Sequence, residues 1–124
     1  MLFRSQAMRA LPLLSAISWL VVLAVSVAAF QQEGMTAGQV FFADIAQFAW
    51  RAQFNLDFLL HLLLFAAWVA WRHRRHRDGL VLAVCCVLGG GLFSLAYLFC
   101  AAVRARGDIP TLLLGAHRGP QGNA

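Results

Sequence analysis

The sequence predicts an all-α membrane protein with three transmembrane helices and an amphipathic interfacial helix that leads into the second of them. Three observations support this fold class. Hydrophobic residues make up 61% of the 124 residues, against about 45–50% in an ordinary soluble domain. Charged residues make up 12%, about half the usual share. The apolar residues gather in three long runs, and a soluble domain of this size could not bury so much apolar surface.

The first apolar run covers residues 10–30 and contains no charged residue. About 20 apolar residues are enough to cross the hydrocarbon core of a bilayer. Arg4 and Arg9 precede the run, in a segment over residues 1–9 that is expected to be cytoplasmic. A signal peptide is the competing interpretation, because positive residues precede an apolar stretch that ends in small residues. The run is longer than the apolar region of about 7–15 residues in a signal peptide, which favours an uncleaved transmembrane helix.

Residues 31–53 are expected to form an outer loop, in which residues 36–53 form an amphipathic helix that lies in the membrane interface. Thr36 followed by Gln39 fits a capping box, in which two side chains satisfy free backbone groups at the start of a helix. Apolar and polar residues then fall on separate helical faces. Because no Gly or Pro follows until after the second apolar run, the helix is predicted to continue into a second transmembrane helix over residues 54–71.

The third apolar run covers residues 80–103 and is predicted to form one continuous transmembrane helix. Small residues recur along one face of this helix, which lets the backbone of another helix approach closely. The alternative is that Gly is simply frequent in membrane helices. The predicted packing seam consists of Cys86, Gly90, Ser94, Tyr97 and Ala101.

Residues 104–124 are predicted to form a short tail. Gly107 and Pro110 end the third helix, and the apolar stretch that follows is too short to cross a membrane. The last six residues, rich in Gly, Pro and polar groups, are expected to be disordered.

The basic loop over residues 72–79 is predicted to lie in the cytoplasm, because clustered arginines are hard to translocate. The residues expected to anchor this topology are Arg72, Arg74, Arg75 and Arg77. With the N-terminus inside and the tail outside, six of the ten arginines are cytoplasmic and four are not. A lipid or partner site in the loop is the alternative interpretation. Nucleic acid is not expected as a partner, because the arginines lie beside apolar runs instead of on a solvated domain.

Asp57 and His61 stand in the second apolar run, four residues apart and so on one helical face. Ionisable groups in membrane helices usually face the bundle interior and pair, so both side chains are expected to point inward. The candidate intramembrane polar site comprises Asn55, Asp57, His61 and Trp68. It is either a structural polar clasp or a ligand or proton-relay site. Haem held by two histidines needs a second His at the same depth, and no other His lies in an apolar run.

No enzyme motif is found: the chain lacks a phosphate-binding loop, a His-Glu-x-x-His pattern and clustered carboxylates. We therefore expect no metal and no cofactor, and favour a non-enzymatic accessory, assembly or homo-oligomeric protein. Its partners would be the lipid bilayer and either a membrane protein or further copies of the chain. The alternative is a protein that handles a lipid, a quinone or protons through Asp57 and His61.

The stretches "FFADIAQF", "NLDFLLHLLLFAAWVAWR", "YLF" and "GDIPTLLLG" suggest a family. Over residues 39–115 the chain resembles small three-span bacterial membrane proteins that are classed as domains of unknown function. The resemblance implies a bacterial inner-membrane location and a three-span layout. It implies no activity and no site residues.

Overall fold

Helices account for every regular element in residues 2–119, which the computed structural model describes. They are α1 (Leu2–Glu33), α2 (Ala37–Ala46), α3 (Trp50–Arg72), α4 (His76–Ala105), α5 (Ile109–Leu114) and the 3₁₀ helix η1 (Gly115–His117). The predicted all-α class is confirmed, and α1, α3 and α4 are each long and apolar enough to cross a membrane. The disorder predicted for the last six residues lies outside the described residues, except at Gly119.

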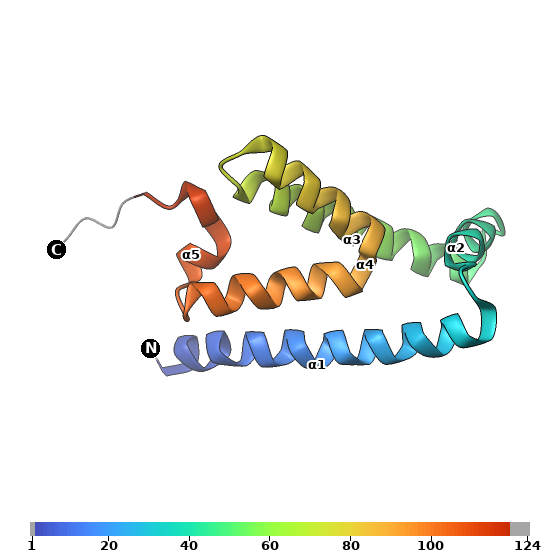
Figure 1. Ribbon diagram of the computed structural model, residues 1–124, viewed down its shortest axis with the longest axis horizontal. Coiled ribbons are helices and arrows are strands. Elements are labelled where there is room, and N and C mark those ends of the chain that lie inside the picture. Colours follow the sequence, from blue (N-terminus) through green and yellow to red (C-terminus); the bar gives the residue numbers. More distant parts are fainter. Residues whose placement is uncertain (1, 120–124) are drawn as a thin grey trace.

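The connection through α2 differs from the single helix expected over residues 36–53. The chain breaks after α2, where Phe48 takes a left-handed backbone conformation (φ 49°), and α3 begins at Trp50. α2 is seen nearly end-on in Figure 1, so it crosses the direction of α1 instead of extending α3. The predicted capping box is wrong, because the Thr36 hydroxyl donates backward to the Glu33 carbonyl at 3.1 Å and makes no capping bond.

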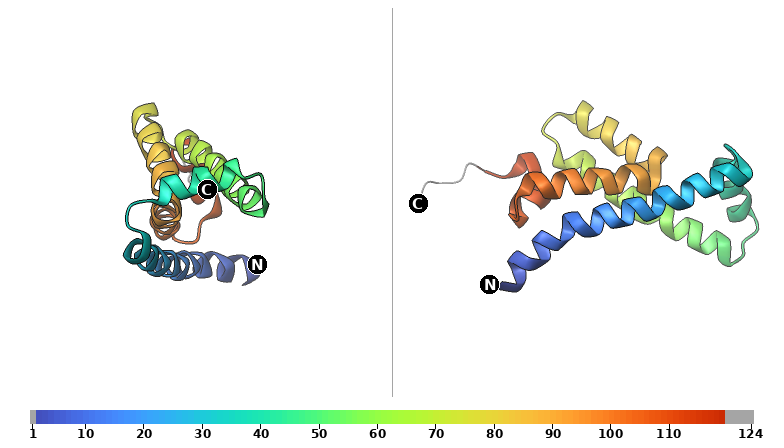
Figure 2. Two further views of the ribbon diagram at one scale, coloured as in Figure 1. Left: turned by 90° about the vertical axis from the view of Figure 1, so that its right-hand side faces the viewer. Right: turned by 60° about the horizontal axis from the view of Figure 1, so that its bottom comes forward.

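α4 does not run straight, because its direction reverses at Gly90. This residue has a non-helical backbone (φ 54°, ψ −139°) in a region that only glycine adopts without strain. The two arms, residues 76–89 and 91–105, form a V in Figures 1 and 2, and both outer ends lie at the end of the molecule where α1 begins. The prediction of one continuous helix over residues 80–103 is therefore wrong.

Each arm of α4 packs against a different helix. The first arm lies on α3, where Cys86 and Val69 are completely buried. The second arm lies on α1, where the Trp19 indole N–H donates to the Leu92 carbonyl at 2.7 Å. The core is consequently two small clusters, and Phe93 and Tyr97 of the second arm also pack against the cluster on α3. α1 and α3 pack mainly on α4 instead of on each other.

The predicted packing seam is divided by this reversal. Cys86 packs on α3, whereas Ala101 packs on Met8 of α1. Gly90 forms the bend, with the ring of Phe58 nearby. The five residues therefore do not form the single continuous face that was predicted. They serve packing within the chain.

We predict that Gly90→Ala lowers the free energy of unfolding by about 1–3 kcal/mol, because alanine at this backbone conformation is strained. The matched control is Gly91→Ala, since a Cβ at Gly91 would make ordinary contact with Val22. Thermal unfolding of both variants in mild detergent measures the difference. Equal stability of the two variants would mean that the backbone at Gly90 is not left-handed.

Candidate functional site

The reversal of α4 gathers positive charge at one end of the molecule, which we call the arginine-rich end. It comprises residues 2–9, 72–78 and 104–118. Arg51 is the only one of the ten arginines outside these segments. The tail and the basic loop were predicted to lie on opposite sides of the membrane. In the structure they lie at the same end of the molecule, because the Arg72 guanidinium donates directly to carbonyl groups of the tail.

Arg72 joins three segments that are distant in the sequence. Its Nε donates to the Leu112 carbonyl at 2.7 Å, its Nη1 to the Tyr97 hydroxyl at 3.0 Å and its Nη2 to the Thr111 carbonyl at 3.2 Å. The guanidinium carbon also lies 5.5 Å from the centre of the Trp68 ring, within range of a cation–π interaction. Arg72 was predicted to be a plain topology anchor. That role stays a prediction, and the side chain also connects α3, the second arm of α4 and α5.

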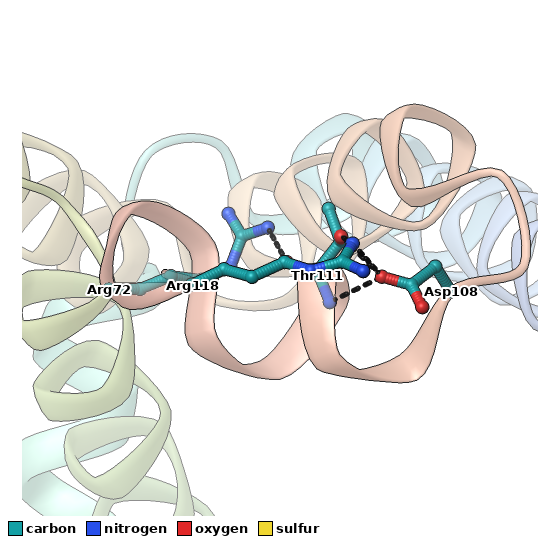
Figure 3. Close-up of polar contacts among 4 residues, drawn as sticks. All are labelled: Arg72, Asp108, Thr111 and Arg118. Carbon is teal, nitrogen blue, oxygen red and sulfur yellow. Dashed lines mark hydrogen bonds and ion pairs between the residues drawn. The ribbon is translucent and has the colours of Figure 1, made fainter. Parts of the chain in front are cut away.

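A second polar group, drawn in Figure 3, holds the tail together internally. Asp108 caps α5 by accepting from the Thr111 backbone N–H at 2.9 Å, and its carboxylate also contacts the Thr111 hydroxyl and the Arg118 guanidinium. The hydrogen bond from the Thr111 side chain is the main cause that lowers the pKa of Asp108. Gly115 lies directly against Arg72, and a Cβ at this position would clash with the Arg72 side chain and carbonyl.

Two tryptophans of α3 contact the tail at this end of the molecule. The Trp68 indole N–H donates to the Leu113 carbonyl at 3.1 Å. The Trp71 ring stacks on His117, with 4.5 Å between ring centres. Trp68 was predicted to share a site with Asp57 and His61, but its partners are Arg72 and the tail. The anchor role of the exposed Arg74, Arg75 and Arg77 stays a prediction.

His73 continues the polar chain from Arg72. Its Nε2 lies 2.8 Å from the Tyr97 hydroxyl. Because that hydroxyl accepts from Arg72, it can donate its own proton to the ring of a neutral His73. Burial is the main cause that lowers the pKa of His73, and the charge of Arg72 adds to it. Both effects favour the neutral imidazole.

A pocket of about 290 Å³ opens between the two arms beside this network. Its polar rim is formed by Arg72, His73, Tyr97 and Arg104, and its walls by Leu82, Phe93, Ala96, Cys100 and Ala101. One end of the pocket is therefore cationic and the remainder is apolar. Arg72 was predicted to be a topology anchor and Tyr97 a member of the packing seam, and only the reversal at Gly90 brings the two side chains together.

The predicted Asp57–His61 site lies elsewhere and is open. His61 Nδ1 lies 3.4 Å from a carboxylate oxygen of Asp57 and 2.8 Å from its backbone carbonyl. The two side chains are 57% and 74% exposed, so the prediction that they point into the bundle is wrong. The ring of Phe58, next to Asp57 in the sequence, lies near Gly90, where the two arms of α4 meet. Asn55 is half-buried and makes no side-chain hydrogen bond within the described residues.

Residues 2–119 contain no group of three or more His, Cys, Asp or Glu side chains that could hold a metal ion. Comparisons of the chain with protein-family models, with curated proteins and with solved structures found no match. The resemblance to small three-span bacterial proteins therefore stays a prediction.

We predict that stability falls as the pH is lowered below about 6.5, the ordinary pKa of histidine. The folded state binds a proton at His73 less readily than the unfolded state does. The contribution of His73 to stability is therefore fully present above about pH 6.5 and is lost as the pH falls towards the lowered pKa of the folded state. Arg72 and Arg104 act in this direction, and Asp78 opposes them. The measurement is the unfolding temperature between pH 7.5 and 5.

His73→Gln should flatten this pH profile, whereas His76→Gln should retain it, because the exposed His76 makes no contact with the network. A His73→Gln variant with the full wild-type slope would assign the pH dependence to another group.

Proposed function

We propose that this chain is a non-enzymatic integral membrane protein that works as an assembly subunit, and that it pairs with a second copy through the Asp57–His61 edge of α3. The exposure of this pair carries the proposal. Both groups stand within a helix that is long and apolar enough to cross a membrane, yet both face away from the rest of the molecule. Ionisable groups in membrane helices almost always face protein or a water-filled cavity.

The cost of leaving the pair in lipid favours a partner. A charged side chain at the centre of a membrane helix costs about 2.5–3.5 kcal/mol on insertion scales. The pair carries both an acceptor and a potential donor, so the edge is complementary to itself. A two-fold axis parallel to α3 would bring the Asp57–His61 pairs of the two copies together at the same depth, where each His61 imidazole can donate to or accept from polar groups of the other copy. Another membrane protein with a polar edge is the alternative partner.

A separate groove of about 350 Å³ supports contact with further helices. It lies between α3 and the first arm of α4 and is lined only by Ala66, Ala67, Ala70, Leu80, Ala83, Val84, Val87 and Leu88. Small residues on an outer face let another helix approach closely. An accessory role, in which the dimer binds a further membrane protein, is compatible with this groove.

The alternative function is a protein that handles a lipid, a quinone or protons through Asp57 and His61. It has less support, because the pair lies on an open face and neither side chain lines the pocket beside Arg72 or the groove between α3 and the first arm of α4.

We further propose that the protein lies in the cytoplasmic membrane of a bacterium with both termini inside. α1 and α3 would then cross the membrane, while α4 would enter and leave on the cytoplasmic side. The distribution of arginine supports this orientation, since it places every arginine except Arg51 in the cytoplasm. The two arms of α4 are each about 20 Å long at 1.5 Å per residue, less than the hydrocarbon core of about 30 Å.

We predict that the purified wild-type protein has the mass of a dimer in mild detergent and that Asp57→Leu/His61→Leu is monomeric. Native mass spectrometry measures both. The matched control is Leu56→Ala/Leu63→Ala, which changes two exposed residues on another face of the same helix and keeps both the pair and the leucines beside it. A monomeric wild type would contradict the homodimer, and an unchanged dimer in the double leucine variant would place the interface elsewhere.

We predict that a fluorescent protein fused to the C-terminus of the full chain is active in the cytoplasm and that alkaline phosphatase at the same place is inactive. An active phosphatase fusion would put the tail outside and contradict the proposed orientation.

A further inference from the structure

We propose that the pocket between the arms of α4 binds the phosphate of an anionic glycerophospholipid, and that one acyl chain of this lipid lies in a neighbouring apolar hollow. The inference rests on the cationic rim of the pocket, on the groups of that rim that remain available, and on the position of the hollow.

The rim offers donors to a phosphate. A guanidinium has five N–H groups, and Arg72 uses three of them within the chain. The other rim cation, Arg104, makes no hydrogen bond or ion pair with the described residues. Asp108 does not line the pocket and is paired with Arg118. The rim therefore carries two positive charges, and basic pockets between membrane helices on the cytoplasmic side are known to suit anionic lipid headgroups.

The apolar hollow has a volume of about 330 Å³ and lies between α1 and the second arm of α4. Its lining, which includes Trp19, Leu20 and Phe99, exposes no polar surface, because the Trp19 indole N–H is taken by the Leu92 carbonyl. Ala96 and Cys100 line both the pocket and the hollow, so the two spaces meet across these small side chains.

The order of the two spaces along the molecule matches a lipid. The pocket lies at the arginine-rich end, while Trp19 and Leu20 stand in the middle of the apolar run of α1. A phospholipid in the adjacent leaflet has its phosphate at the membrane surface and its chains directed inward. A soluble phosphate would match the rim but would leave the hollow without a function.

The first experiment uses the full-length protein, freed of lipid in mild detergent, with phosphatidylglycerol and phosphatidylcholine as probes. Native mass spectrometry should show that phosphatidylglycerol binds about tenfold more tightly than phosphatidylcholine. Arg104→Gln should lower that affinity about tenfold, because a charge-assisted hydrogen bond is lost. Arg77→Gln removes the same charge at the same end but does not line the pocket, so it should retain the affinity. Equal losses in both variants would indicate diffuse attraction and overturn the proposal.

The second experiment separates a lipid from a soluble anion. Cys100→Phe keeps every charge and fills the junction of the two spaces at an exposed position, so it should weaken phosphatidylglycerol binding several-fold. Glycerol 3-phosphate at the same concentration should not displace the lipid. Unchanged binding by the Cys100→Phe variant, or displacement by glycerol 3-phosphate, would overturn the lipid as occupant. This variant also decides the matter if Arg104→Gln fails to fold.

Discussion

The left-handed backbone at Gly90 is the constraint on which the rest of the structure depends. A straight helix would carry Tyr97 about 30 Å from the start of α4 at 1.5 Å per residue. The reversal instead brings its hydroxyl to 3.0 Å from Arg72 and 2.8 Å from His73. It also gives α1 and α3 separate arms to pack against, and it returns the tail to the end where α1 begins. One glycine thus determines the core, the polar network and the distribution of charge.

Arg72 forms hydrogen bonds to the segments that the reversal brings together, the second arm of α4 and α5. A guanidinium presents its donors in a rigid planar fork, so one side chain can bond to Tyr97, Thr111 and Leu112 at once, which the compact ammonium of a lysine could not do with the same geometry. These acceptors come from the second arm and from α5. The aromatic faces of Trp68 and Tyr97 provide further contact. A short tail without its own core is held in this way at the boundary between apolar and polar surroundings.

Composition and the lengths of the apolar runs were enough to predict an all-α chain with three helices able to cross a membrane, because these depend on local residue content. The reversal could not be predicted, since the three consecutive glycines at 89–91 are compatible with either a packing face or a bend in a membrane helix. The Arg72 network was missed for the same reason, because its members meet only when α4 folds back. The spacing of four residues places Asp57 and His61 on one face of α3, but it does not determine whether that face points into the bundle or away from it.

The distance between the two outer ends of α4 tests the reversal most directly. Spin labels on His76→Cys and on the native Cys100, in a chain with Cys85→Ala and Cys86→Ala, can be measured by double electron–electron resonance in lipid bilayers. The fold predicts a mean distance far shorter than the length of the intervening helix, because Cys100 lines the same pocket as His73. A narrow distribution centred near the straight-helix value of about 36 Å, at 1.5 Å per residue, would contradict it.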